Sequence, residues 1–215
     1  KVGFSERKSW EDSLREMFML LSDNEIPNNS GVAIEFKIPN TSNRIDFMIS
    51  GYDSSKNPVV IIIELKGWQE AQGILDKDGI MEKVVTYLGG KPIETTHPSY
   101  QAWSYSRLLI DFNEDVQTKN ISILPCAYLY RFEKQFESEI KSNHYEYYIK
   151  KAPIYLKEDS MKLSDYIKSL IKSGDNNKNL LYLENGKLNP SKSLQDSLSN
   201  MLKGNTEFTM IDNQK

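Results

Sequence analysis

Residues 59–66 read VVIIIELK, a stretch that is apolar as far as Ile63 and then ends in Glu64, Leu65 and Lys66. A run that is apolar on both faces is typical of a central strand covered on both sides, so its charged end is expected where the core stops. Side chains two residues apart in a strand point the same way, which puts Glu64 and Lys66 on one face. The stretch therefore predicts the middle strand of a sheet, with two charged groups at its end.

Two more strands are predicted just before this one. The segment VAIEFKI (32–38) alternates with the period of a strand, and RIDFMIS (44–50) carries Asp46 in its interior. Turn-forming residues separate the three strands, and an apolar stripe over 5–22 predicts a helix ahead of them. Because sequential strands usually pair, Asp46 and Glu64 are expected on neighbouring strands.

The rest of the chain predicts helices and one further strand. A helix is predicted over 98–112, and in it Gln101 and Tyr105 are four residues apart and face the same way. Residues 120–130 have the composition of a buried strand. The glycines in 67–96 indicate irregular structure with one or two short strands. Further helices are predicted along the C-terminal part of the chain.

Asp46, Glu64 and Lys66 are the residue types that metal-dependent phosphodiester hydrolysis needs. That reaction uses carboxylates to hold one or two Mg²⁺ ions, and a group that orients or deprotonates the attacking water. The competing interpretation is a solvated strand end with a cross-strand ion pair. Tyr105 and Gln101 have two interpretations as well: a packed aromatic residue beside a half-buried amide, or members of the same centre.

Composition limits the classes of protein to which the chain can belong. Its 215 residues, 39% hydrophobic and 27% charged, fit one principal globular domain. The net charge of −3 gives no positive field that would attract nucleic acid to the whole molecule. The chain shows no membrane-length apolar run, no secretory signal and a single cysteine, Cys126, which together predict a cytoplasmic protein without membrane contact. It contains neither a serine-hydrolase nucleophile elbow nor an ATP-binding G-x-x-x-x-G-K-[ST] loop.

Three stretches carry a resemblance to a known family: RIDFMISG, VVIIIELKGW and HPSYQAWSYSRLL. In this order they resemble the motifs of PD-(D/E)xK nucleases of the RecB-like branch, including its Gln-x-x-x-Tyr motif at Gln101 and Tyr105. Most of residues 5–130 also resembles the N-terminal region of bacterial proteins that carry a Schlafen-like DNA/RNA helicase domain. The resemblance implies an α/β, restriction-endonuclease-like core, with a mixed central sheet flanked by helices, over 1–158. A helical extension over 159–215 would lead to the helicase domain.

The same resemblance implies a metal centre that binds Mg²⁺ or Mn²⁺. It implies that the ligands are Asp46, Glu64 and the Leu65 carbonyl, that Lys66 supports catalysis, and that Gln101 and Tyr105 lie near the scissile strand.

Four further residues are candidates for the site. Many members of the family use an acid from the first helix, a role that Glu6 matches best and Glu35 second. Glu6 reads equally well as a first-turn acid favoured by the helix dipole. Arg44 is expected to hold a phosphate or to pair with a carboxylate. His97 is expected to cap the helix that begins at residue 98, or to contact a phosphate.

Two functional hypotheses follow from the sequence. The first is a metal-dependent nuclease domain that cleaves nucleic acid, DNA more than RNA, coupled to a helicase domain of the same polypeptide and acting in phage defence or DNA repair. The second is a catalytically inactive module that binds nucleic acid or forms a homodimer and so regulates the helicase. The acidic net charge disfavours a pure binder of nucleic acid.

Overall fold

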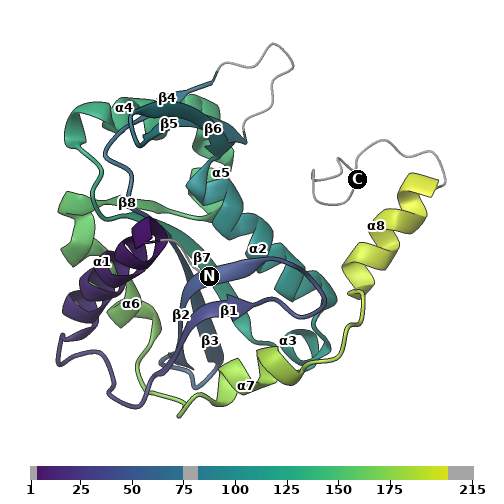
Figure 1. Ribbon diagram of the computed structural model, residues 1–215. Helices are drawn as coiled ribbons and strands as arrows, with labels where there is room; N and C mark the ends of the chain where they lie inside the picture. Colours follow the sequence, from purple (N-terminus) through teal and green to yellow (C-terminus); the bar gives the residue numbers. More distant parts are fainter. Residues whose placement is uncertain (1–3, 75–81, 203–215) are drawn as a thin grey trace.

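A computed structural model describes residues 4–74 and 82–202 of the chain, with side chains described over 11–74 and 82–200. Its centre is a five-stranded mixed sheet in the order β1-β2-β3-β7-β8 (Figure 1). The first three strands pair antiparallel, whereas β3 with β7 and β7 with β8 pair parallel. The strands are β1 (Gly31–Lys37), β2 (Arg44–Tyr52), β3 (Pro58–Lys66), β7 (Ser122–Leu129) and β8 (Ile154–Leu156).

Helices cover both faces of this sheet (Figure 1). One face carries α1 (Phe4–Leu21) and α6 (Ser160–Leu170), and the other carries α2 (Pro98–Phe112), α3 (Glu114–Thr118) and α7 (Lys178–Asn185). The α/β class and the mixed sheet flanked by helices, both predicted from the sequence, are confirmed.

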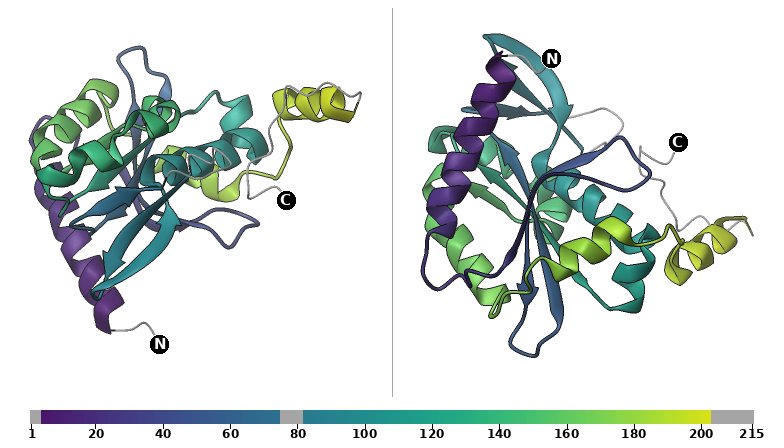
Figure 2. Two further views of the ribbon diagram at one scale, coloured as in Figure 1. Left: turned by 90° about the horizontal axis from the view of Figure 1, so that it is seen from above. Right: turned by 60° about the horizontal axis from the view of Figure 1, so that its bottom comes forward.

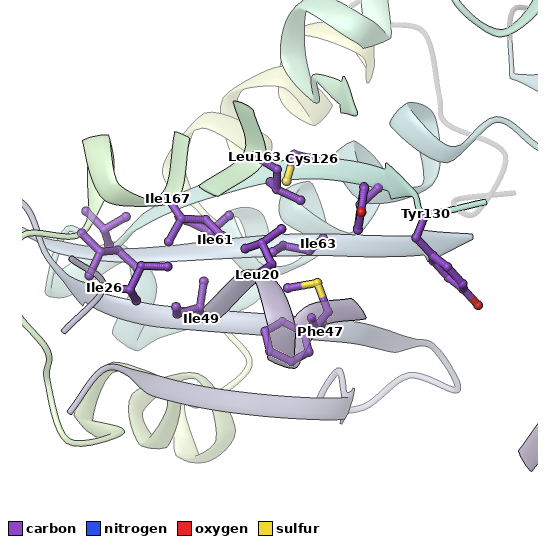
Figure 3. Close-up of a cluster of buried hydrophobic side chains, with 14 residues drawn as sticks. Leu20, Ile26, Phe47, Ile49, Ile61, Ile63, Cys126, Tyr130, Leu163 and Ile167 are labelled. Atoms are coloured by element: carbon purple, nitrogen blue, oxygen red, sulfur yellow. The ribbon is translucent and has the colours of Figure 1, made fainter. Parts of the chain in front are cut away.

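The middle strand β3 builds the two halves of the core. Ile61 and Ile63 pack with Leu20 of α1 and Ile167 of α6 (Figure 3). Val60 and Ile62 point to the opposite cluster, which α2 and α7 cover. All four β3 side chains are fully buried. The apolar run therefore forms a central strand covered on both sides, as the sequence predicts.

A second, three-stranded sheet lies in the connection between β3 and α2. It consists of β4 (Ala71–Gly73), β5 (Lys83–Leu88) and β6 (Lys91–Thr96), all antiparallel. Gly89 and Gly90 join β5 to β6 with positive φ at both residues, a backbone conformation that favours glycine in tight hairpins. The sequence predicts one or two short strands here, whereas the structure has three. The glycine pair that interrupts the periodicity forms the turn of the β5–β6 hairpin.

Short helical segments pack beside this second sheet or near β8. They are η1 (Lys134–Phe136), α4 (Glu137–Ile140), η2 (Asn143–Tyr145), α5 (Glu146–Lys151) and η3 (Lys157–Asp159). The first four of them share a third buried cluster with β4 and β5, to which Phe132, Ile140 and Tyr145 belong.

The C-terminal part of the described chain is divided between packed and projecting helices. Leu163 and Ile167 of α6, and Leu183 of α7, are fully buried in the core of the sheet. The boundary at 158/159 stays a prediction, and α6 and α7, which lie beyond it, pack on the same sheet as the elements before it. Among the described elements, α8 (Lys192–Leu202) projects from the rest of the molecule (Figure 2), although its Leu194 is buried.

Asp175 fastens the segment between α6 and α7 to the sheet. Its carboxylate accepts hydrogen bonds from the Gly31 and Asn179 main-chain N–H groups, at 3.0 and 2.8 Å, and from the Ser50 hydroxyl. The side chain is buried, so these bonds are shielded from water.

None of the helices that the structure describes has the length and apolarity required to cross a membrane.

Candidate active site

The candidate site lies where β2 and β3 stop pairing. The last ladder pair in this direction joins Phe47 to Ile63. Beyond it, the Leu65 N–H donates a 2.8 Å hydrogen bond to Asp46 Oδ2, so a carboxylate takes the place of a main-chain carbonyl. The N–H and C=O groups of one residue in a strand point to the same side, so the Leu65 carbonyl also faces the side of Asp46. The predicted ligands Asp46 and Leu65 thus lie together.

The neighbouring strand β1 is distorted opposite Asp46. Ile34 pairs with Phe47 and Phe36 with Ile45, which places Glu35 across from Asp46. Glu35 has a φ of 52°, in the left-handed region that costs a non-glycine residue about 1 kcal/mol or more. Such strain persists where the surrounding structure fixes it, and it clusters at functional sites.

The left-handed residue also disturbs the alternation of side chains. Ala33 and Phe36, three residues apart, both pack against the cluster under α2 and α7. Ile45 and Met48 on β2 do the same. The uninterrupted alternation predicted for 32–38 is therefore wrong at Glu35, for a reason that composition does not reveal.

Glu64 is the most buried of the site residues. Its side chain is 1% exposed, and its Oε1 lies 2.7 Å from Lys66 Nζ. Its Oε2 is buried and accepts no hydrogen bond from the part of the chain that the structure describes. Burial raises the pKa of Glu64 to about 8, with the charge of Lys66 opposing this shift and that of Asp46 adding to it. A half-satisfied buried carboxyl group is costly in a core, so it calls for a further partner.

Lys66 stays charged despite its position. Burial alone would lower its pKa, but the charges of Glu64 and Asp46 more than offset that effect and hold the pKa of Lys66 above its ordinary value. The ammonium group is thus a fixed positive charge beside two carboxyl groups.

Helix α2 adds Gln101 and Tyr105 to the same centre. The Gln101 Nε2 group donates a 3.1 Å hydrogen bond to the Tyr105 hydroxyl. Burial raises the pKa of Tyr105, and the charge of Glu64 raises it further. The hydroxyl therefore stays protonated and lies within electrostatic range of the Glu64 and Lys66 charges. Five residues predicted from two strands and a helix are brought together.

The remaining predicted residues lie around this centre. Arg44 is 58% exposed and lies 3.7 Å from the Glu35 carboxylate, so of its two interpretations the structure shows the carboxylate pair. Glu35 itself lines a cavity with Asp46. Glu6 belongs to α1, but its side chain lies outside the described residues. Of the side chains that the structure describes, no three Asp, Glu, His or Cys groups converge as a metal-binding set.

His97 is the N-cap of α2, one of the two roles predicted for it. Its Nδ1 accepts a hydrogen bond from the Ser99 N–H at 3.2 Å, its Nε2 lies 3.0 Å from the Ile140 carbonyl oxygen, and its ring stacks on Tyr145. The side chain is fully buried, which leaves it no surface for a phosphate. Burial lowers the pKa of His97 to about 4.

The pKa of His97 predicts a pH dependence of stability. The unfolded chain binds this proton near pH 6.5 and the folded chain only near pH 4, so the free energy of unfolding falls as pH falls between these values. The loss expected from this residue is about 3 kcal/mol. Denaturant unfolding of His97→Asn, which keeps a capping side chain, should give lower stability at pH 7 but a flatter decline towards pH 4. Parallel declines in the two proteins would contradict this assignment.

A cavity of about 330 Å³ opens beside the centre. Asp46, Leu65 and Lys66 form one side of it, and α1, β1 and Tyr130 form the rest. In the sequence, Leu14, Ile34 and Tyr130 gave no signal of this role, because only the packing of α1 over β1 brings them together.

Comparisons of the chain with protein-family models, with curated proteins and with solved structures found no match.

Proposed function

We propose that this chain is a divalent-metal-dependent nuclease domain of the PD-(D/E)xK type that hydrolyses phosphodiester bonds of nucleic acid. The observation that carries the proposal is the buried Glu64 carboxyl group, which has one oxygen on Lys66 and the other without a hydrogen bond from any described residue, next to Asp46. Structural ion pairs at a solvated strand end are not buried in this way.

The donor set fits Mg²⁺ or Mn²⁺. Both ions prefer oxygen ligands, and Asp46, Glu64 and the Leu65 carbonyl offer carboxylate and carbonyl oxygens at one place. A cation there would satisfy the Glu64 oxygen and favour the ionised form of the group, against the effect of burial. When bound, the metal supplies Lewis-acid stabilisation of the phosphate and a lowered pKa of the attacking water.

The other residues act directly on the substrate and the water. The Lys66 ammonium can stabilise negative charge on the phosphate and orient the nucleophile. The Tyr105 hydroxyl remains a proton donor at neutral pH, and Gln101 fixes its position through their hydrogen bond. These groups lie on α2 and β3, whose packing in the core holds them in place.

A second candidate function rests on the Glu64–Lys66 ion pair. Lys66 lies 2.7 Å from Glu64 and neutralises the buried acid directly. In a non-catalytic module for nucleic-acid binding or dimerisation, this pair would serve the fold and would need no metal. The two functions differ in one respect that can be measured, the response to divalent cations.

Mg²⁺ or Mn²⁺ is expected to stabilise the folded protein. A ligand at 100 times its Kd adds about 2.7 kcal/mol, which for a chain of this size raises the Tm by about 5 to 10 °C. Differential scanning fluorimetry with and without metal should show this rise, EDTA should reverse it, and Asp46→Asn should abolish it. The matched control is Asp12→Asn, which changes a partly exposed acid paired with Arg131 and away from the site. No rise in the wild-type protein, together with no cleavage of DNA or RNA, would favour the non-catalytic module.

The broader parts of the proposal are supported by the family resemblance. These are DNA in preference to RNA as substrate, a helicase domain in the same polypeptide, and a role in phage defence or repair.

A further inference from the structure

The cavity beside the candidate active site has two chemically different ends. Asp46 and Lys66 form the charged end, where the proposed function places the phosphate. Leu14 of α1, Ile34 of β1 and Tyr130, which follows β7, form the other walls, together with the polar residues Ser13 and Glu35. In Figure 3, Tyr130 lies at the end of the core cluster with its hydroxyl pointing away from the other labelled side chains. Apolar side chains, with Ser13 and Glu35 beside them, therefore adjoin the charged centre.

The volume exceeds what a metal centre requires. The space measures about 330 Å³. It lies at the lower end of the range for small-molecule sites, about 300 to 1,000 Å³. With the cation of the proposed function at Asp46, a ligand that fills the space would have a negatively charged end and an apolar body, as a nucleotide does.

The walls carry an apolar side chain that the protein does not cover. Ile34 is 50% exposed although it lies on a strand next to the site. The left-handed backbone of Glu35, the next residue, fixes the course of β1 along this wall. A planar base placed against Ile34 and Leu14 would remove this apolar surface from water, and that contact is available to every base because all have apolar faces.

We infer that this cavity, the α1 pocket (Leu14, Ile34 and Tyr130 with Asp46 and Lys66), binds the base of the nucleotide whose phosphate lies at the metal centre. The inference rests on the proposed function, since that function places the phosphate at Asp46 and Lys66. The α1 pocket lies between a helix and a sheet, so a base inside it contacts protein on its sides. Such a base is no longer stacked on the neighbouring bases of its strand. Leu14, Ile34 and Tyr130 are then substrate-positioning residues.

Binding of two small probes to the full chain tests the α1 pocket. Thymidine 5′-monophosphate has a base, and 2-deoxyribose 5-phosphate has the same phosphate and sugar without one. In Mg²⁺, the nucleotide should shift the methyl NMR signals of Leu14 and Ile34 and bind about 10-fold or more tightly than the sugar phosphate.

Two variants on the same strand sharpen the test. Ile34→Trp fills the pocket and should remove the preference for the nucleotide, so that the two probes bind with similar affinities. Val32→Trp is the matched control, because Val32 is 43% exposed on β1 and does not line the pocket. Both positions face solvent in part, so both variants are expected to fold.

The outcomes separate this inference from the proposed function. Equal affinities for the two probes, no binding of the nucleotide, or an unchanged preference in Ile34→Trp would each overturn the base pocket. Cleavage of DNA that depends on Mg²⁺, combined with equal probe affinities, would leave the nuclease intact without the pocket. Base-dependent binding without any cleavage would overturn the nuclease and leave a nucleotide site.

Discussion

Lys66→Ala is expected to lose metal-dependent cleavage of nucleic acid, with a fall in rate of about 10²- to 10⁴-fold or more. The reason is the position of the ammonium group, which lies 2.7 Å from Glu64 and remains charged next to Asp46. The alanine variant has no group that can stabilise charge on the phosphate or orient the water from this place. The measurement is the initial rate of cleavage of single- and double-stranded DNA and RNA in Mg²⁺ and Mn²⁺.

Two comparisons make this result specific. Lys150→Ala removes an exposed lysine that pairs with Glu146 on α5, and it should cleave like the wild-type protein. Lys66→Ala should keep the rise in Tm with Mg²⁺, since Asp46, Glu64 and the Leu65 carbonyl remain. Cleavage by Lys66→Ala at the wild-type rate would contradict the assignment of the active site.

A chain that ends at residue 158 is expected not to fold. It lacks Leu163, Ile167, Leu180 and Leu183, four side chains that are buried in the core. Burial of one such side chain contributes about 1.5 to 3 kcal/mol, so the four contribute about 6 to 12 kcal/mol. That sum is comparable to the whole stability of a typical domain, about 5 to 15 kcal/mol. Circular dichroism and thermal unfolding of the purified fragment should show no cooperative transition.

The matched truncation ends at residue 191. It removes α8, which has one buried apolar side chain, Leu194, among its described residues, and keeps α6, α7 and the hydrogen bonds of Asp175. This chain is expected to unfold cooperatively with a Tm close to that of the full chain. A folded 1–158 fragment would contradict the assignment of α6 and α7 to the core and would support the boundary predicted from sequence.

The sequence predicted the central elements well because their signals are local. The apolar run before Glu64 identified the middle strand, and proline at the first position of α2 placed the start of that helix at residue 98. The spacing of Gln101 and Tyr105 on one helix face, and of Glu64 and Lys66 on one strand face, then followed from the geometry of each element. Together these residues form the candidate centre.

What the sequence did not predict depends on contacts between distant segments. The hairpin of β5 and β6 was missed because its turn glycines also interrupt any helical or strand period. The left-handed Glu35 is set by its neighbours in β1 and β2, and no residue type signals it. The helices α6 and α7 were assigned to an extension because the sequence does not show that Leu163 and Leu183 meet the sheet.

The pairing of Glu64 with Lys66 also predicts how the folded chain responds when a chelator removes the metal. Lys66 acts as a built-in counter-ion, so in the folded chain the buried acid is partly neutralised before any cation binds. Small domains whose folding depends on zinc unfold when a chelator removes it. In the proposed nuclease, chelation is expected to abolish cleavage without unfolding the chain. Adding the cation again is then expected to restore cleavage without a refolding step.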